Sequence, residues 1–163
     1  MNVRIFIEST WKGPAKRDGV AMWLVEYMRG DEPVTRQGFV HLENGTEIRG
    51  NLMAMINAFF ILKKSCSASV FTQCESILNT VRNCWHIQWK KNGWKNAKGK
   101  DVKNKDLWEM LIETSRPHAY SLCSGHHDYS NVMETELKKE EARWKSGKNS
   151  GTGSKNPPGR MCR

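Results

Sequence analysis

The N-terminal third of the chain carries short apolar blocks separated by turn-forming residues, which is the pattern of β-strands. We expect strands at residues 3–7, 20–29 and 34–42. Residues 9–19 contain turn formers with little periodicity and predict a loop, and residues 30–33 predict a second turn. Three consecutive strands joined by short connections predict an antiparallel meander.

After residue 45 the apolar positions change to helical spacing. They predict a helix over residues 47–64, with Thr46 as its N-cap. The rest of the chain predicts a strand at 68–72, a helix at about 74–83, a helix at about 104–115, a strand at 119–123 and a helix at 131–144. The order βββαβαβα predicts an α/β fold with a five-stranded mixed sheet, in which two strands enter through helical crossovers.

The C-terminal residues 146–163 contain almost nothing apolar, so we expect a flexible basic tail after a single domain at 1–145. The five cysteines form no C-x-x-C pair, which argues against a disulfide framework and a zinc site. No apolar run approaches the roughly 18 residues of a membrane span. We therefore expect a cytoplasmic monomer without a membrane partner.

The charge balance points to a polyanionic partner. Lys and Arg number 26 and Asp and Glu number 17, which gives a net charge of +9. A positive field of this size attracts nucleic acid, the commonest polyanion in a cell. The alternative interpretation is a basic surface without a ligand.

The basic residues are densest between residues 85 and 108, where indoles are interleaved with them. Cations neutralise phosphates and flat rings rest against sugars or bases, so this segment has the composition of a nucleic-acid-binding surface. The alternative is that the indoles belong to the core and the lysines are only solvated. The candidate binding residues are Trp85, Trp89, Lys90, Lys91, Trp94, Lys95, Lys103 and Trp108.

The runs W-x-x-x-W-K-K-N-G-W-K from Trp85 and V-K-N-x-D-L-W from Val102 are similar to the basic handle of bacterial type 1 ribonuclease H. The similarity extends from the first strand to the last helix, over about 140 residues, in the element order of that family. The resemblance implies a ribonuclease H-like fold. It also implies that the handle grips the DNA strand of an RNA/DNA hybrid.

The resemblance further implies a catalytic set in which four carboxylates hold two divalent ions, Mg²⁺ or Mn²⁺, that cleave the RNA strand. Glu8 matches the first acid, whereas Asn51 and Gln73 stand at the second and third positions. Glu136 matches the fourth, with Glu134 as an alternative. Only Glu8 and Glu136 would then remain as charged metal ligands, because an amide offers a neutral oxygen.

Other residues match the family around this set. His126 follows Gly125 where the family has a mobile Gly-His pair that assists water entry or product release. Thr46 and Arg49 match residues at the start of the long helix that contact a phosphate. The loop at 12–18 is basic but lacks the family pattern for contacting the RNA strand.

Three functional hypotheses follow. The first is a module that binds RNA/DNA hybrid or duplex nucleic acid and has lost most or all of its hydrolysis. The second is an active, divergent ribonuclease H that uses Glu8 and Glu136 with an altered metal preference. The third is a scaffold whose basic surface contacts an acidic protein, which the steep salt dependence of nucleic-acid binding would separate from the first.

Overall fold

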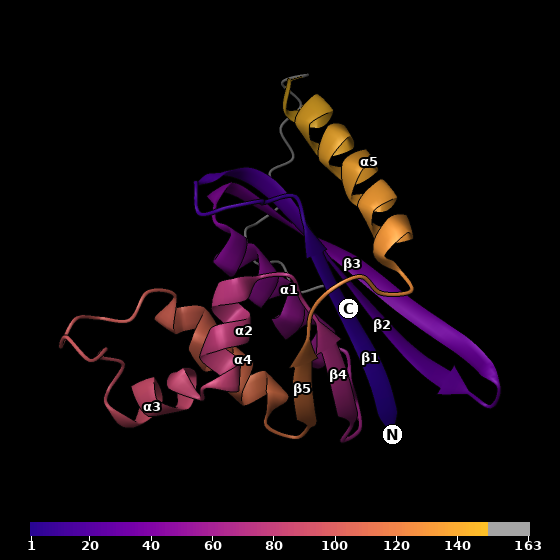
Figure 1. Ribbon diagram of the computed structural model, residues 1–163. Helices are drawn as coiled ribbons and strands as arrows, with labels where there is room; N and C mark the ends of the chain where they lie inside the picture. The colour runs from indigo at the N-terminus through magenta and orange to yellow at the C-terminus, as the bar shows by residue number, and fades with distance from the viewer. Residues whose placement is uncertain (150–163) are drawn as a thin grey trace.

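A five-stranded mixed sheet forms the centre of the computed structural model, which describes residues 1–149 (Figure 1). Its order is β3-β2-β1-β4-β5, with β1, β2 and β3 antiparallel and β4 and β5 parallel to β1. The strands are β1 Asn2–Ser9, β2 Arg17–Arg29, β3 Glu32–Gly45, β4 Ser67–Phe71 and β5 Ala119–Cys123. The predicted meander and mixed sheet are confirmed.

Five helices cover the two faces of the sheet. They are α1 Glu47–Phe60, α2 Glu75–Arg82, α3 Trp85–Lys91, α4 Lys105–Ser115 and α5 Ser130–Asn149. In Figure 1, α5 lies alone on one face, α1 and α4 lie on the other, and α3 with the loop after it protrudes from the body. No helix within residues 1–149 is long and apolar enough to span a bilayer.

Side chains along a strand point alternately to the two faces of the sheet, so the apolar residues form a core on each face. Val3, Ile5 and Ile7 of β1 point to the α1 side and join the larger core. Phe6, between them, points to the opposite side and packs with Met133 and Leu137 of α5. Glu8 shares the parity of Phe6, so its side chain lies on the α5 face, at the end of β1.

The strands β1, β2 and β3 are longer than predicted, and two predicted helix ends are wrong. The first long helix ends at Phe60 rather than residue 64, because the chain turns there to enter β4, although Leu62 still packs on the core. The last helix runs to Asn149, so residues 146–149, assigned to the tail, are helical. The rest of the predicted tail lies outside the described residues.

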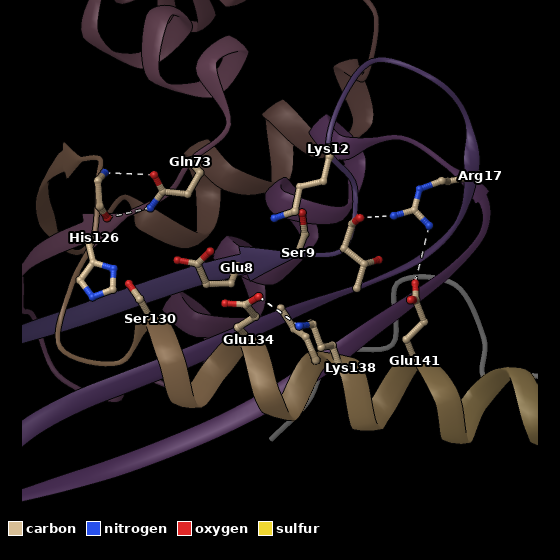
Figure 2. A pocket seen from close by; sticks show the side chains of 13 residues that line it. Glu8, Ser9, Lys12, Arg17, Gln73, His126, Ser130, Glu134, Lys138 and Glu141 are labelled. Carbon is tan, nitrogen blue, oxygen red and sulfur yellow. Dashed lines mark hydrogen bonds and ion pairs between the residues drawn. The ribbon is translucent and has the colours of Figure 1, made fainter.

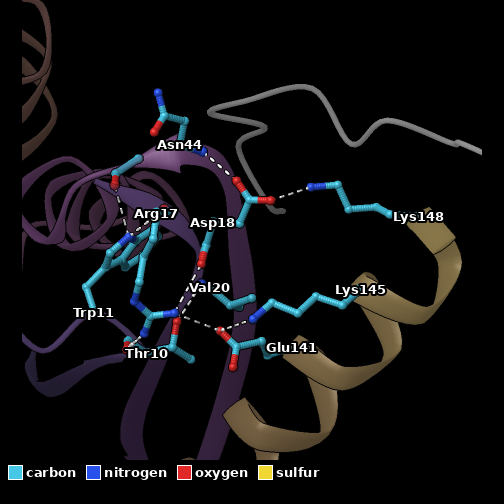
Figure 3. Close-up of polar contacts among 10 residues, drawn as sticks. Thr10, Trp11, Arg17, Asp18, Val20, Asn44, Glu141, Lys145 and Lys148 are labelled. Carbon is cyan, nitrogen blue, oxygen red and sulfur yellow. Dashed lines mark hydrogen bonds and ion pairs between the residues drawn. The ribbon is translucent and has the colours of Figure 1, made fainter. Parts of the chain in front are cut away.

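Trp11 holds the loop after β1 in place. Its indole is buried in a niche formed by three glycines, Gly19, Gly45 and Gly50. A Cβ on Gly50, in the first turn of α1, would lie only 2.3 Å from the Trp11 ring. The indole Nε1 donates to the carbonyl oxygens of Arg17 (3.0 Å) and Gly45 (3.1 Å), as Figure 3 shows. The loop backbone next to Trp11 is therefore fixed against α1 and β3.

Charged contacts fasten the second half of α5 to the sheet. Lys148 pairs with Asp18 at 2.9 Å (Figure 3), and the largely buried Glu140 pairs with His41 at 2.7 Å. These contacts fix the position of the C-terminal half of α5. They therefore also determine which face of its first turns points toward β1.

Candidate functional site

A cavity of about 460 Å³ opens where the end of β1 meets α5. The residues that line it come from β1, the loop after it, the start of β2, the segment after β4, the loop before α5 and α5 itself (Figure 2). They are Glu8, Ser9, Thr10, Lys12, Arg17, Gln73, Gly125, His126, Ser130, Glu134, Leu137, Lys138 and Glu141. The cavity thus unites three predicted catalytic residues, Glu8, Gln73 and His126.

Glu8 is held by a histidine that the sequence interpretation missed. The buried ring of His127 lies with its Nε2 at 2.7 Å from the Glu8 carboxylate. Its Nδ1 accepts a hydrogen bond from the backbone N–H of Tyr129 at 3.1 Å, so Nε2 carries the proton and donates it to Glu8. The only sequence signal was the second histidine of the pair after Gly125, and His126, the predicted one, is exposed.

Asn51, at the second acid position, is buried and fully engaged. Its amide nitrogen donates to the carbonyl oxygen of Glu47 at 2.8 Å and to the hydroxyl of Ser9 at 3.2 Å. Its amide oxygen accepts from the hydroxyl of Thr72 at 3.2 Å. Asn51 does not line the cavity, and it connects α1 with the ends of β1 and β4. These contacts favour a structural role for the Asn51 amide, and a catalytic role at this position stays a prediction.

Gln73, at the third position, lines the cavity but is bound to the loop before α5. Its amide nitrogen donates to the carbonyl oxygen of Gly125 at 3.0 Å, and the backbone N–H of Gly125 donates to its amide oxygen at 3.0 Å (Figure 2). A carboxylate cannot form this reciprocal pair because it has no donor. Gln73 therefore anchors the segment that carries His126.

On α5 the acid that faces the cavity is Glu134. Its carboxylate pairs with Lys138 at 3.2 Å (Figure 2). Glu136 is two residues further, which rotates it by about 200° around the helix. It does not line the cavity and lies 3.9 Å from Lys139. The cavity lining favours the alternative at Glu134, and the role of Glu136 as catalytic residue and metal ligand stays a prediction.

The donor set does not fit the pair of divalent ions that the family resemblance implies. Within residues 1–149 no group of three or more Asp, Glu, His or Cys is placed to hold a metal ion. The two remaining carboxylates, Glu8 and Glu134, already have a histidine and a lysine as partners. Both amides are engaged by protein groups, so no side chain at the four positions is left free.

In the handle, which we define as residues 85–103, the lysines face solvent. Lys90 lies 3.8 Å from Glu113, and Lys95 is paired with Asp101 across a short hairpin. The ammonium groups of Lys91 and Lys103, as well as those of Lys98 and Lys100, form no ion pair within the described chain and are exposed. The handle therefore presents positive charge that internal contacts do not neutralise.

The indoles of the handle, together with that of Trp108 in α4, divide into two groups. Trp85 is 43% exposed and remains a candidate for contact with a ligand. Trp94 and Trp108 are buried, at 8% and 3% exposure, and Trp89 is half-buried with its ring 6.1 Å from that of Trp108. Trp94 and Trp108 are therefore part of the core, as the alternative interpretation of these indoles expects, and their contact with nucleic acid stays a prediction. Trp94 has a φ of 64°, held by a 2.7 Å hydrogen bond from its N–H to the carbonyl of Trp89.

Thr46 and Arg49 serve the fold at the start of α1. Thr46 is the N-cap, and its hydroxyl accepts from the N–H of Arg49 at 3.3 Å, as predicted. The guanidinium of Arg49 forms two hydrogen bonds with Asp106, at 3.0 and 2.8 Å, and so ties α1 to α4. The hydrogen bonds from Arg49 lower the pKa of Asp106. Arg49 is therefore engaged within the protein rather than free to meet a phosphate.

Comparisons with known proteins agree with this architecture. The RNase H family model matches residues 4–143. Ribonuclease HI of Haemophilus ducreyi is 30% identical over 141 residues, which cover 85% of this chain and 88% of that protein. Ribonuclease H of Novosphingobium aromaticivorans is 33% identical over 117 residues, covering 72% and 78%. The chain belongs to the RNase H family.

Solved structures show the same fold. LC9-RNase H1, a type 1 RNase H with the type 2 active-site motif, superposes with a TM-score of 0.68 at 22% identity, over 85% of this chain and 72% of that one. LC11-RNase H1, solved in complex with RNA/DNA hybrid, superposes with a TM-score of 0.52 at 10% identity, over 83% and 92%. The predicted ribonuclease H-like fold is confirmed.

Proposed function

We propose that this chain binds RNA/DNA hybrid through the handle and the cavity, and that it hydrolyses the RNA strand at a strongly reduced rate or not at all. One observation supports the proposal that hydrolysis is reduced or absent. Each side chain at the four acid positions is already bound within the protein, and two of the four carry no charge. Losing a ligand charge costs on the order of 10²–10³ in rate by analogy with other electrostatic deletions.

Binding is supported by the unpaired lysines of the handle and by family membership. A steep linear decrease of log affinity with log salt is expected, because phosphate neutralisation releases counterions. A scaffold that recognises an acidic protein would instead bind the hybrid weakly.

The test measures binding and cleavage in the same samples. A labelled RNA/DNA hybrid is incubated with the purified protein in Mg²⁺ and, separately, in Mn²⁺, followed by a gel shift and a denaturing gel. We expect a shifted complex with intact RNA. Metal-dependent cleavage that disappears in a Glu8→Ala variant would contradict the proposal and exclude a contaminating nuclease.

A weakly active nuclease is the second candidate, because Glu8, Glu134 and His126 line the same cavity. The double variant Asn51→Glu, Gln73→Asp separates the two candidates, after its folding has been checked by circular dichroism. Cleavage that appears only in this variant indicates that the missing charges limit the reaction. Cleavage by the wild type that Glu134→Gln abolishes, while Glu136→Gln does not, supports the second candidate.

A further inference from the structure

We propose that Glu26 of β2 is a positioning residue for Glu8, and that it acts through the loop before α5. Glu26 lies opposite Arg4 in the sheet and does not line the cavity. The inference rests on the proposed function, in which the engagement of Glu8 within the protein is one reason for slow or absent hydrolysis. It names the residue outside the cavity on which that engagement depends.

The carboxylate of Glu26 is buried, with 8% of the residue exposed, and its two oxygens have different partners. Oε1 accepts a hydrogen bond from Nε of Arg4 at 2.8 Å and lies 2.7 Å from Nη2 of the same guanidinium. Oε2 accepts a hydrogen bond from the hydroxyl of Tyr129, in the loop before α5. A buried carboxylate requires a counter-charge, which Arg4 supplies. The bond to Tyr129 has a separate effect, because it ties the loop to β2.

Aromatic packing and one backbone hydrogen bond connect Tyr129 to His127. Both rings lie against that of Phe6 in β1, with centroid distances of 5.0 Å for Tyr129 and 4.5 Å for His127. The backbone N–H of Tyr129 donates to Nδ1 of His127 at 3.1 Å, which leaves the ring proton on Nε2. Nε2 then donates to the Glu8 carboxylate at 2.7 Å. A displacement of Tyr129 would therefore change both the tautomer and the orientation of the ring that holds Glu8.

Two observations make Tyr129 the main connection between the loop and the strands. Burial, together with the hydrogen bond to Glu26, raises the pKa of Tyr129 to about 12, so its hydroxyl keeps the proton that it donates at neutral pH. The other connection is the ion pair of Asp128 with Arg4 at 3.0 Å, in which the Asp128 side chain is 73% exposed. An ion pair so exposed to solvent contributes little.

The first experiment records NMR spectra of the free, full-length protein at neutral pH. The ring nitrogen shifts of His127 report its tautomer, and the exchange of its Nε2 proton with water reports how often the contact with Glu8 opens. We expect the Nε2–H tautomer in the wild type. Tyr129→Phe should accelerate the exchange about tenfold, because a lost hydrogen bond of ordinary strength changes a local opening equilibrium by about that factor. The carboxylate carbon resonance of Glu8 should shift as well.

The matched control is Tyr120→Phe. The hydroxyl of Tyr120 is hydrogen-bonded to Ser115, and its ring packs on Phe59 of α1, on the opposite face of the sheet. This variant also loses a phenolic hydrogen bond, so urea unfolding should show a decrease in stability similar to that of Tyr129→Phe. The signals of His127 and Glu8 should stay as in the wild type. If Tyr120→Phe changes them as much as Tyr129→Phe does, the effect is one of general stability and the inference is overturned.

The second experiment tests whether Glu26 acts through Tyr129. Glu26→Met keeps the length of the side chain but offers no carboxylate acceptor, and it should also accelerate the exchange of the His127 Nε2 proton about tenfold. The double variant Glu26→Met, Tyr129→Phe should exchange no faster than Tyr129→Phe alone, because both changes remove the same contact. If Glu26→Met does not fold, as judged by circular dichroism, Tyr129→Phe and its control decide the question.

The outcomes separate this inference from the proposed function. Exchange in Tyr129→Phe that equals the wild type, or single effects that multiply in the double variant, overturns the inference only. A wild type that does not shift the RNA/DNA hybrid contradicts the proposed function, but it leaves the NMR result intact because the spectra are recorded without nucleic acid.

Discussion

The handle and the cavity differ in how their polar groups are used. In the handle, the ammonium groups of Lys91 and Lys103 face solvent and have no ion-pair partner within residues 1–149, while Trp94 and the neighbouring Trp108 of α4 are buried. In the cavity, Glu8 and Gln73 are both bound to protein groups. The handle lysines thus keep their charge exposed to solvent, whereas the side chains of Glu8, Asn51 and Gln73 are engaged by contacts within the fold.

The largest expected effect concerns the buried indole of Trp108 in α4. Trp108→Ala should lower the free energy of unfolding by about 3–5 kcal/mol, because it removes a large buried side chain and leaves a cavity. Trp85→Ala should change it by less than about 0.5 kcal/mol, since its ring is exposed. Urea unfolding of both variants measures the difference. Equal unfolding midpoints of the two variants would contradict the division of these indoles into a buried group and an exposed group.

The next effect tests whether the amide at position 51 is structural. Asn51→Ala should destabilise the protein by about 1–3 kcal/mol, because it removes the hydrogen bonds of a buried amide to Glu47, Ser9 and Thr72. Asn51→Asp should also destabilise it, because a carboxylate would face the Glu47 carbonyl oxygen. Urea unfolding is again the measurement, with the exposed Gln88→Ala as control. An Asn51→Asp variant as stable as the wild type would contradict the structural role.

The handle lysines should contribute to binding without contributing to stability. Lys91→Gln and Lys103→Gln should each reduce the log–log salt slope of hybrid binding by about 1, with unchanged unfolding midpoints. Lys64→Gln, an exposed lysine outside the handle, is the control. Slopes that match the wild type in both handle variants would show that the handle does not meet the phosphates.

The smallest expected effect concerns the pKa of Tyr129, in the loop before α5. Burial, together with a hydrogen bond to Glu26, raises the pKa of Tyr129 from 10.0 to about 12. Since the unfolded chain releases this proton first, the stabilisation is complete below about pH 10 and is lost as the pH rises toward 12. The unfolding midpoint of the wild type should therefore decrease more than that of Tyr129→Phe between pH 9 and 11. Parallel decreases would contradict this assignment.

Much of the fold could be predicted from the sequence because it depends on local periodicity. The five strands and the long helix α1 follow from apolar spacing, and the handle follows from a dense motif. The burial of the individual indoles could not be predicted. It depends on how α3 and α4 pack together, and the sequence alone does not distinguish Trp85 from Trp108. The site was predicted less well because its chemistry depends on contacts over long sequence separations, such as that between Glu8 and His127.

The choice between Glu134 and Glu136 could not be made from the sequence. Met133 and Leu137 are the apolar pair, spaced by four, that α5 buries against the sheet. Glu134 and Glu136 flank this buried face on opposite sides, each about 80° from its centre, so the apolar pair does not distinguish them. Only the tertiary structure shows that the cavity lies on the side of Glu134.

The reciprocal hydrogen bonds between Gln73 and Gly125 have a consequence for substitution at position 73. An aspartate there would add a carboxylate to the cavity and at the same time release the carbonyl of Gly125, because a carboxylate cannot donate to it. Charge and anchorage are thus coupled at one side chain. A negative charge cannot be added at this position without loosening the segment that carries His126.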